Sequence, residues 1–210
     1  MAFAIRCIIR GSVRVTREGR RQMKKSLVIL LACGSLFAGA AEIGGVKLDD
    51  TAKVSGQDLV FNGGGIRTKY GIAKVYVAGL YAAQKTNNAD AVVNAVTPRR
   101  VVLSMLRKVE AEKLHESLLD GLEENTTEAE FAALQPRLKE MNAIFQGVKE
   151  VKEGDLIALD FLPGKGTQIT VRGQIRDVIG GDDFSRALLR VWLGKKPVSD
   201  SLKSGMLGGK

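Results

Sequence analysis

The stretch from Ile66 to Ala83 constrains the fold most, because it is long, rich in Tyr, Val and Ile, and interrupted at Gly71. β-branched and aromatic residues on both sides of Gly71 predict two strands joined by a tight bend. Asn62 to Gly65, just before it, predicts a flexible break. The sequence therefore indicates a β-hairpin over this stretch.

Other short segments also predict strands. They are Val46–Leu48, Lys53–Val54, Leu59–Phe61, Arg100–Leu106 and a three-strand meander over Asp155–Leu162, Thr167–Arg172 and Gln174–Val178. Turn residues separate most of these segments. We expect them to pair mostly as antiparallel neighbours.

Helices are predicted between and after these strands. Apolar spacings of three and four predict them over Asn88–Val96, Ala111–Leu122, Asp183–Leu193 and Asp200–Leu207. Another helix is predicted from Thr127, because Thr127 and Glu130 form a capping-box pattern before an apolar stripe that ends at Phe145. Pro136 lies inside that stripe and is expected to kink or split the helix. Strands in two groups with helices between them predict an α+β fold, with a mostly antiparallel sheet covered on one face.

The first 41 residues have a different composition from the remainder. Residues 23–41 combine two lysines, a short apolar run and small residues, which is the layout of a secretory signal peptide, with cleavage after Ala40 or Ala41. We interpret residues 1–22 as an over-extended start before Met23. The expected mature domain is 42–210, periplasmic or secreted, with no transmembrane segment. Lipid attachment at Cys33 is the alternative.

The net charge of +9 is concentrated in this leader. Residues 1–41 hold eight basic residues and one acidic residue, which leaves 24 basic and 22 acidic residues in 42–210. A body with a balance of +2 has no broad basic surface for nucleic acid. Both cysteines, Cys7 and Cys33, fall in the leader, so the mature chain has no disulfide, thiolate metal site or Cys nucleophile.

Motifs for catalysis or metal binding are weak. His115 is the single histidine and lacks a second ligand at metal-binding spacing, so we interpret it as a surface or half-buried structural residue. Gly63 to Lys69 lacks the Gly-Lys-Ser/Thr ending of a phosphate-binding loop. We expect no metal and no cofactor. Arg67 stands out, because an Arg in an apolar strand either lies at a rim in water or faces a cavity as a fixed cation.

Two blocks of the sequence resemble the chalcone isomerase-like superfamily. The N-terminal block is Phe61 to Arg67 followed by Lys74 to Tyr81, and the C-terminal block is Ser185 to Gly194 with Leu202 to Gly208. The resemblance covers roughly 45–208. It implies an open-faced β-sandwich, in which a large antiparallel sheet and a layer of helices enclose a ligand cleft.

The resemblance also suggests site residues. Arg67 matches the Arg that orients the substrate oxygen in the enzymes, and Ser185 matches a C-terminal hydroxyl. Tyr76 stands where the enzymes have a strand Thr. On the next helix, Glu110 replaces a Tyr and Ser117 replaces an Asn. These departures put flavonoid cyclisation in doubt, whereas Arg67 with Tyr76 is similar to the carboxylate-binding pair of the fatty-acid-binding members.

Three hypotheses follow. The first is an exported, non-catalytic binder of a fatty acid or other apolar carboxylate, with Arg67 and Tyr76 at the polar end and Ser117 and Ser185 as further contacts. The second is an isomerase, an intramolecular lyase acting on a chalcone-like phenolic or enone substrate, with Arg67, Tyr76 and Ser185 as its catalytic groups. The third is an envelope protein whose cleft receives a partner peptide.

Overall fold

The computed structural model describes residues 40–209. The leader predicted over 1–41 therefore lies outside the described residues, except for Ala40 and Ala41. The strands are β1 (Ala41–Ile43), β2 (Val46–Leu48), β3 (Thr51–Val54), β4 (Gln57–Lys69), β5 (Ala73–Ala82), β6 (Arg99–Met105), β7 (Val109–Glu110), β8 (Glu150–Val151), β9 (Leu156–Leu162), β10 (Gly166–Val171) and β11 (Gln174–Ile179). The helices are α1 (Ala89–Val93), α2 (Ala111–Glu124), α3 (Glu128–Val148), α4 (Asp182–Leu193) and α5 (Asp200–Met206).

Seven strands form one antiparallel sheet in the order β11-β10-β9-β6-β5-β4-β3. This confirms the predicted α+β class and the predicted hairpin, which turns at Gly71. The sequence did not predict the short pairs β1–β2 and β7–β8. The β7–β8 pair joins the start of α2 to the end of α3, and the Ala111 amide donates to the Lys149 carbonyl there.

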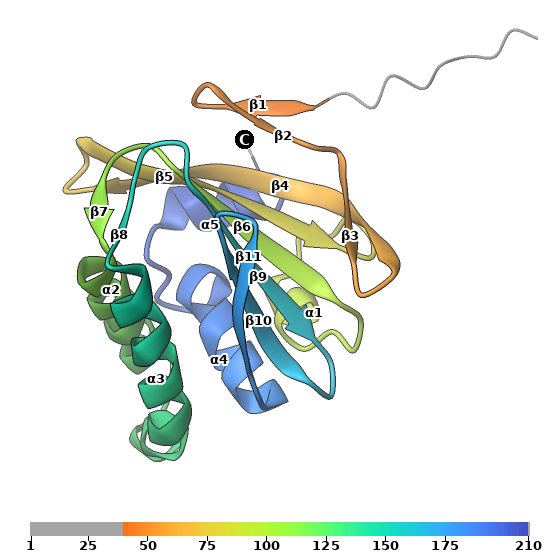
Figure 1. Cartoon of the computed structure of the whole chain (residues 1–210). Coiled ribbons are helices and arrows are strands. Elements are labelled where there is room, and N and C mark those ends of the chain that lie inside the picture. The colour runs from red at the N-terminus through yellow and green to blue at the C-terminus, as the bar shows by residue number, and fades with distance from the viewer. Residues whose placement is uncertain (1–39, 210) are drawn as a thin grey trace, which may run out of the picture. The chain divides into compact units, whose positions relative to one another are not determined.

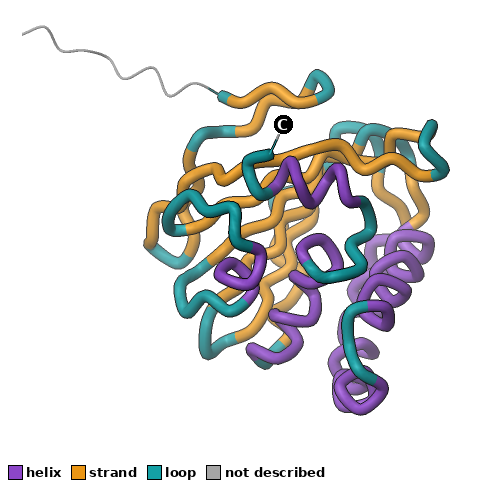
Figure 2. Tube along the Cα trace, turned by 180° about the vertical axis from the view of Figure 1, so that it is seen from behind, coloured by secondary structure: helices purple, strands orange, loops and turns teal. Residues whose placement is uncertain are grey.

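The helices lie on one face of the sheet (Figures 1 and 2). The larger hydrophobic cluster is on this face and contains Leu80 and Leu103 from the sheet together with Leu188 and Trp192 from α4. A small cluster around Leu59 and Tyr81 lies on the opposite face. Alternate residues of β5 therefore serve both faces, as strand geometry requires.

The predicted break from Asn62 to Gly65 is wrong, because these residues continue β4 without interruption. A Cβ on Gly63 would collide with backbone atoms of Gly205 and Gly208, and a Cβ on Gly205 would collide with the Gly64 carbonyl. The glycines therefore let α5 approach β4 closely, which is another established use of glycine in strands. Asn62 forms a bulge in β4, and its side chain bonds to the backbone of Thr86 and Met206.

The helix predictions are confirmed in type and differ in extent. α1 covers only Ala89–Val93, with Asn88 as its N-cap. α3 begins with the predicted capping box of Thr127 and Glu130, and it remains one helix through Pro136. Proline removes one backbone donor there, yet buried side chains on both sides, Leu134 and Leu138, hold the helix on the core.

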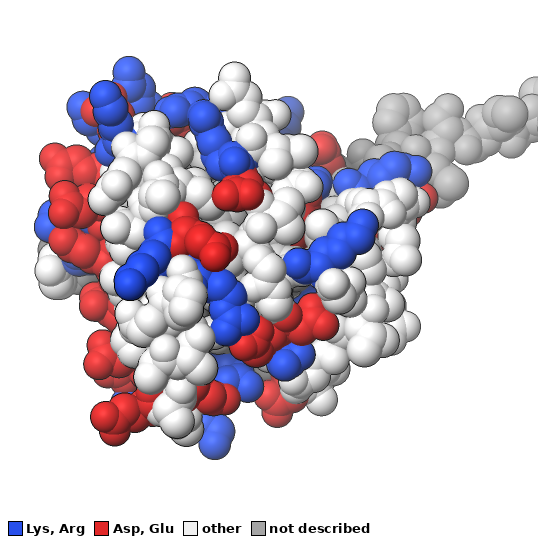
Figure 3. All heavy atoms as spheres, turned by 60° about the horizontal axis from the view of Figure 1, so that its bottom comes forward, with Lys and Arg blue, Asp and Glu red and all other residues white. Residues whose placement is uncertain are grey.

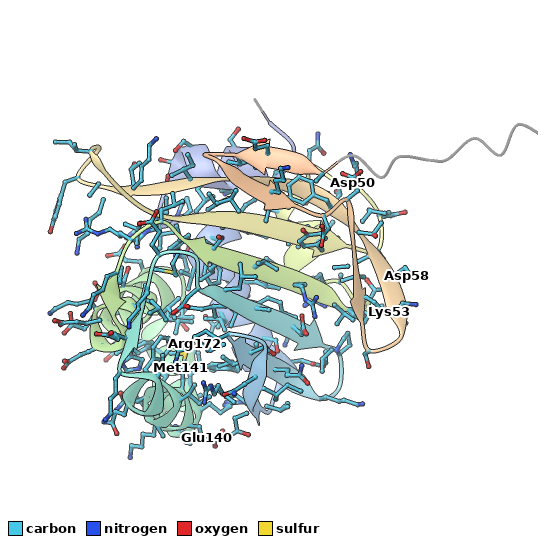
Figure 4. The ribbon with its side chains drawn as sticks, turned by 45° about the horizontal axis from the view of Figure 1, so that its top comes forward. Asp50, Lys53, Asp58, Glu140, Met141 and Arg172 are labelled. Carbon is cyan, nitrogen blue, oxygen red and sulfur yellow. The ribbon has the colours of Figure 1, made fainter. Side chains whose placement is uncertain are left out.

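The sheet-facing side of α3 is apolar. Met141 is buried and points toward the sheet, whereas its neighbour Glu140 points away (Figure 4).

On the face shown in Figure 3, acidic and basic side chains are interspersed. Within residues 40–209, no helix has the length and apolar character needed to cross a bilayer.

Candidate binding site

Arg67 and Tyr76 face each other across the β4–β5 pair. They are register partners, so both side chains lie on the helix-covered face of the sheet. The guanidinium carbon lies 5.8 Å from the centre of the Tyr76 ring. A register shift follows immediately, between Arg67 and Thr68, and this irregularity ends the regular pairing beside the site.

The Arg67 guanidinium is only partly satisfied. Its Nη2 donates a 3.0 Å hydrogen bond to the Oγ of Ser117 on α2. Its Nε is buried and has no partner. A buried donor without an acceptor is unfavourable by about 1–3 kcal/mol, so this nitrogen is an unsatisfied donor within the site.

The Tyr76 hydroxyl is fully buried and receives a 3.0 Å hydrogen bond from Nε1 of Trp192 on α4. Burial raises the pKa of this hydroxyl above its ordinary value, and the Arg67 charge offsets part of the rise. Tyr76 is therefore neutral at physiological pH. Since its oxygen already accepts from Trp192, its own proton is available for donation.

Arg67, Tyr76 and Ser117 line a cavity between the sheet and the helices. The remainder of its wall is almost entirely apolar, and no carboxylate from the described residues lines it. Its volume is about 40 Å³. Side chains from three helices close it, among them Leu114, Leu118, Met141, Ile144, Phe145 and Trp192.

A larger groove of about 560 Å³ lies outside this cavity, and Arg67, Leu114 and Ser117 line both spaces. These three residues thus separate the closed interior from the open groove. Glu110, placed by sequence on the same helix as Ser117, is the N-cap of α2 and lines the groove but not the cavity.

Ser185 lies apart from the other predicted site residues. It is buried on α4, and its hydroxyl is 2.8 Å from that of Thr167 on β10. The described lining of the cavity does not include it. The structure therefore brings Arg67, Tyr76 and Ser117 together and places Ser185 in a separate hydroxyl pair.

Trp192 was missed as a site residue. Its segment was predicted as a helix and belongs to the C-terminal block of the resemblance, but no contact with a ligand or with Tyr76 was assigned to it. The available signal was its place as the single tryptophan of the chain, because a buried indole N–H requires an acceptor. That acceptor, Tyr76, is 116 residues away and could not be identified from spacing.

His115 is more buried than predicted. It packs between α2 and α3 with its ring centre 5.3 Å from that of Phe145, and its Nε2 has no partner. It does not line the main cavity. Within residues 40–209 no group of three or more His, Cys, Asp or Glu is placed to hold a metal ion.

Comparisons with known proteins agree with this architecture. A crystal structure of a fatty-acid binding protein from Arabidopsis thaliana is similar with a TM-score of 0.62 at 16% sequence identity, covering 78% of this chain and 92% of that one. At this identity the likeness establishes the fold. No curated protein matches the sequence. The sequence model of the chalcone isomerase-like family matches residues 40–208. The chain therefore belongs to the chalcone isomerase-like family.

Proposed function

We propose that this protein is a non-catalytic binder of a fatty acid or a similar apolar carboxylate, held with its head group at Arg67 and Tyr76. One observation carries the proposal: the buried Nε of Arg67 has no partner at the polar end of an apolar cavity. The free proton of Tyr76 adds a second donor beside it. Two convergent donors without an acceptor match a carboxylate.

The polar residues of the cavity favour binding over catalysis. Arg67 donates only, and Tyr76 stays protonated because burial raises its pKa. Trp192 likewise donates only. An isomerase would need a general base, and these three groups are poor bases at neutral pH. The fold shared with the Arabidopsis fatty-acid binding protein supports the same conclusion.

The cavity must widen to take a lipid. An apolar cavity of about 150 Å³ accepts benzene, so about 40 Å³ is too small for an alkyl chain. We propose that α2 and α3 move outward on binding. Phe131, Ile144 and Phe145 of α3 are only partly buried, but moving this helix would also expose the buried Leu134, Leu138 and Met141. Ten buried methylenes contribute roughly 8 kcal/mol toward this opening.

The decisive test is a titration of delipidated protein with palmitate and with hexadecanol, which differ only in the head group. We expect palmitate to bind more tightly. Charge-assisted hydrogen bonds contribute about 1.5–3 kcal/mol, so Arg67→Met should weaken palmitate roughly 10- to 150-fold and leave hexadecanol little changed. Arg176→Met, which alters an exposed arginine on β11, is the matched control.

Equal affinity for the acid and the alcohol would contradict the proposal, as would unchanged palmitate binding in Arg67→Met. Cyclisation of a chalcone far above its spontaneous rate, abolished by Arg67→Met, would instead establish the isomerase.

We also propose that the protein is exported and that a signal peptide within residues 23–41 is removed by cleavage after Ala40 or Ala41. The support is the signal-peptide layout of that segment. N-terminal sequencing of the protein from the envelope fraction of its native host should begin at Ala41 or Glu42. A lipid-modified peptide beginning at Cys33 would establish a lipoprotein instead.

A further inference from the structure

The tip of the β4–β5 hairpin projects beyond the ends of the strands, next to β7 (Figure 1). It carries two large apolar side chains that touch almost nothing. Tyr70 is 86% exposed and Ile72 is 88% exposed. Only Gly71 separates them in the sequence, so they form a local apolar tip and not scattered surface residues.

The backbone conformation of this turn does not favour a tyrosine at position 70. Tyr70 and Gly71 both have positive φ, 55° and 70°, and the Ile72 amide donates to the Lys69 carbonyl. This is the geometry of a type I′ turn, which favours Asn or Gly at both central positions. A tyrosine there is conformationally unfavourable, and in return its ring gains only an exposed contact with the Lys69 ammonium, which lies 5.3 Å from the ring centre. Folding alone therefore does not account for Tyr70.

Basic residues surround the tip. The groove beside it is lined by five basic residues and one acidic residue, namely Arg67, Lys69, Arg107, Lys108, Lys113 and Glu110. Lys74 lies exposed on β5 immediately after the turn. Lys108 and Lys113 are paired with Glu150 and Glu116, but Lys69, Lys74 and Arg107 form no ion pair with any described residue.

We propose that this hairpin tip docks onto the surface of an anionic lipid bilayer. Tyr70 and Ile72 enter the headgroup region, where aromatic residues with a polar end are favoured. Lys69, Lys74 and Arg107 contact the anionic headgroups. The tip combines an apolar end with a cationic flank, which is the chemistry of interfacial membrane anchors.

If the hairpin tip faces the bilayer, the groove beside it becomes a path for a ligand from the bilayer to Arg67. The groove runs from the tip to Arg67 and Ser117, which also line the inner cavity. An apolar carboxylate leaving the bilayer would thus meet cationic side chains along the path to Arg67. This consequence rests on the proposed function, whereas the docking itself does not.

The test uses residues 41–210, which contain the complete seven-stranded sheet and both hydrophobic clusters and so have a core of their own. The apolar leader would bind lipid by itself and is left out. Vesicles of phosphatidylcholine alone are compared with vesicles in which roughly 30% of the lipid is the anionic phosphatidylglycerol. Bound protein is measured by co-sedimentation. We expect binding to the anionic vesicles only, weakening as salt rises.

Two pairs of substitutions separate the apolar and cationic contributions. Tyr70→Asn with Ile72→Ser should weaken binding about tenfold or more. Lys69→Gln with Lys74→Gln should weaken it roughly fivefold for each lysine. Val96→Ser, at an equally exposed apolar residue, and Lys165→Gln are the matched controls and should change nothing.

Tyr70→Asn also has a diagnostic effect on stability. Because Asn tolerates positive φ better than Tyr, this variant should raise the melting temperature by about 2–4 °C while it weakens vesicle binding. Reduced vesicle binding in a more stable protein cannot result from misfolding.

Insertion is measured directly with a fluorophore. Residues 41–210 contain no cysteine, so Ile72→Cys provides one labelling site for a polarity-sensitive dye, with Val96→Cys as the control. We expect a blue shift on anionic vesicles at position 72 only. Equal binding to both vesicle types, or full binding by Tyr70→Asn with Ile72→Ser, overturns the docking. Retained palmitate binding in those samples shows that the proposed function survives, whereas loss of palmitate binding alone contradicts only that function.

Discussion

The indole Nε1 of Trp192 donates a 3.0 Å hydrogen bond to the hydroxyl oxygen of Tyr76, which joins helix α4 to the centre of the sheet. Both groups are buried, so neither has water as a substitute partner. The bond orients the Tyr76 hydroxyl beside Arg67 and leaves its proton free. The Trp192–Tyr76 hydrogen bond therefore stabilises the packing of α4 on the sheet and also orients a donor at the polar end of the cavity.

This pair predicts a coupling energy. Tyr76→Phe leaves the Trp192 donor unsatisfied and should destabilise the protein by about 1–3 kcal/mol. Trp192→Phe should be at least as harmful, because it also removes buried volume. Combined, the two losses should be non-additive by about 0.5–1.5 kcal/mol. Urea unfolding followed by circular dichroism suits all variants, since Trp192 is the only tryptophan. Additive losses would show that the bond contributes little.

His115 predicts a loss of stability in mild acid. Burial lowers the pKa of its imidazole below the ordinary value of about 6.5, and Glu112 and Glu116 offset part of that effect. The unfolded chain therefore binds a proton more readily than the folded protein. Stability from this group is complete above about pH 6.5 and falls as the pH decreases toward the folded-state pKa.

The measurement is the urea midpoint at pH 7.5 and pH 5.5 for the unmodified protein and for His115→Leu. The variant should lose less stability over this interval. If both proteins lose the same amount, groups other than His115 control the acid response.

Replacing glycine with alanine should have opposite effects on stability at Gly63 in β4 and at Gly147 in α3. Gly63→Ala places a Cβ against the backbone of α5 and should destabilise the protein by about 1–3 kcal/mol. Gly147→Ala is the control, because it meets nothing within 4 Å on the exposed face of α3 and should be neutral or stabilising by up to about 1 kcal/mol. Denaturant midpoints measure both. A neutral Gly63→Ala would argue against the tight contact between β4 and α5.

Arg100 and Asp160 form an ion pair on the sheet face opposite the helices. Nη2 of Arg100 lies 2.8 Å from one carboxylate oxygen, and Nε bonds the other. Asp160 is only 4% exposed, so Arg100→Ala should cost about 3–5 kcal/mol by leaving a buried charge unpaired. Arg100→Met with Asp160→Leu should recover most of that loss. Thermal and urea unfolding of the single and double variants decide between these outcomes.

Local patterns in the sequence determined much of the fold. Residue type and spacing predicted the β4–β5 hairpin, the capping box of Thr127 and the final three-strand meander, because each depends on residues that are close in the chain. The resemblance to the chalcone isomerase-like family named Arg67 and Tyr76 as a pair at the polar end of a cleft, whereas their direct register across β4 and β5 came from the structure. Ser117 was also named from the sequence, although its bond to Arg67 was not.

Contacts between distant segments decided the remainder. Gly63 has a sterically required place only because α5, more than 130 residues later in the chain, packs against it. Trp192 reaches Tyr76 only after α4 packs on the sheet. The volume of the cavity depends on how side chains from three helices fill one space. Periodicity indicates which face of an element is buried, but the partner and the tightness of its packing arise only when all the elements assemble.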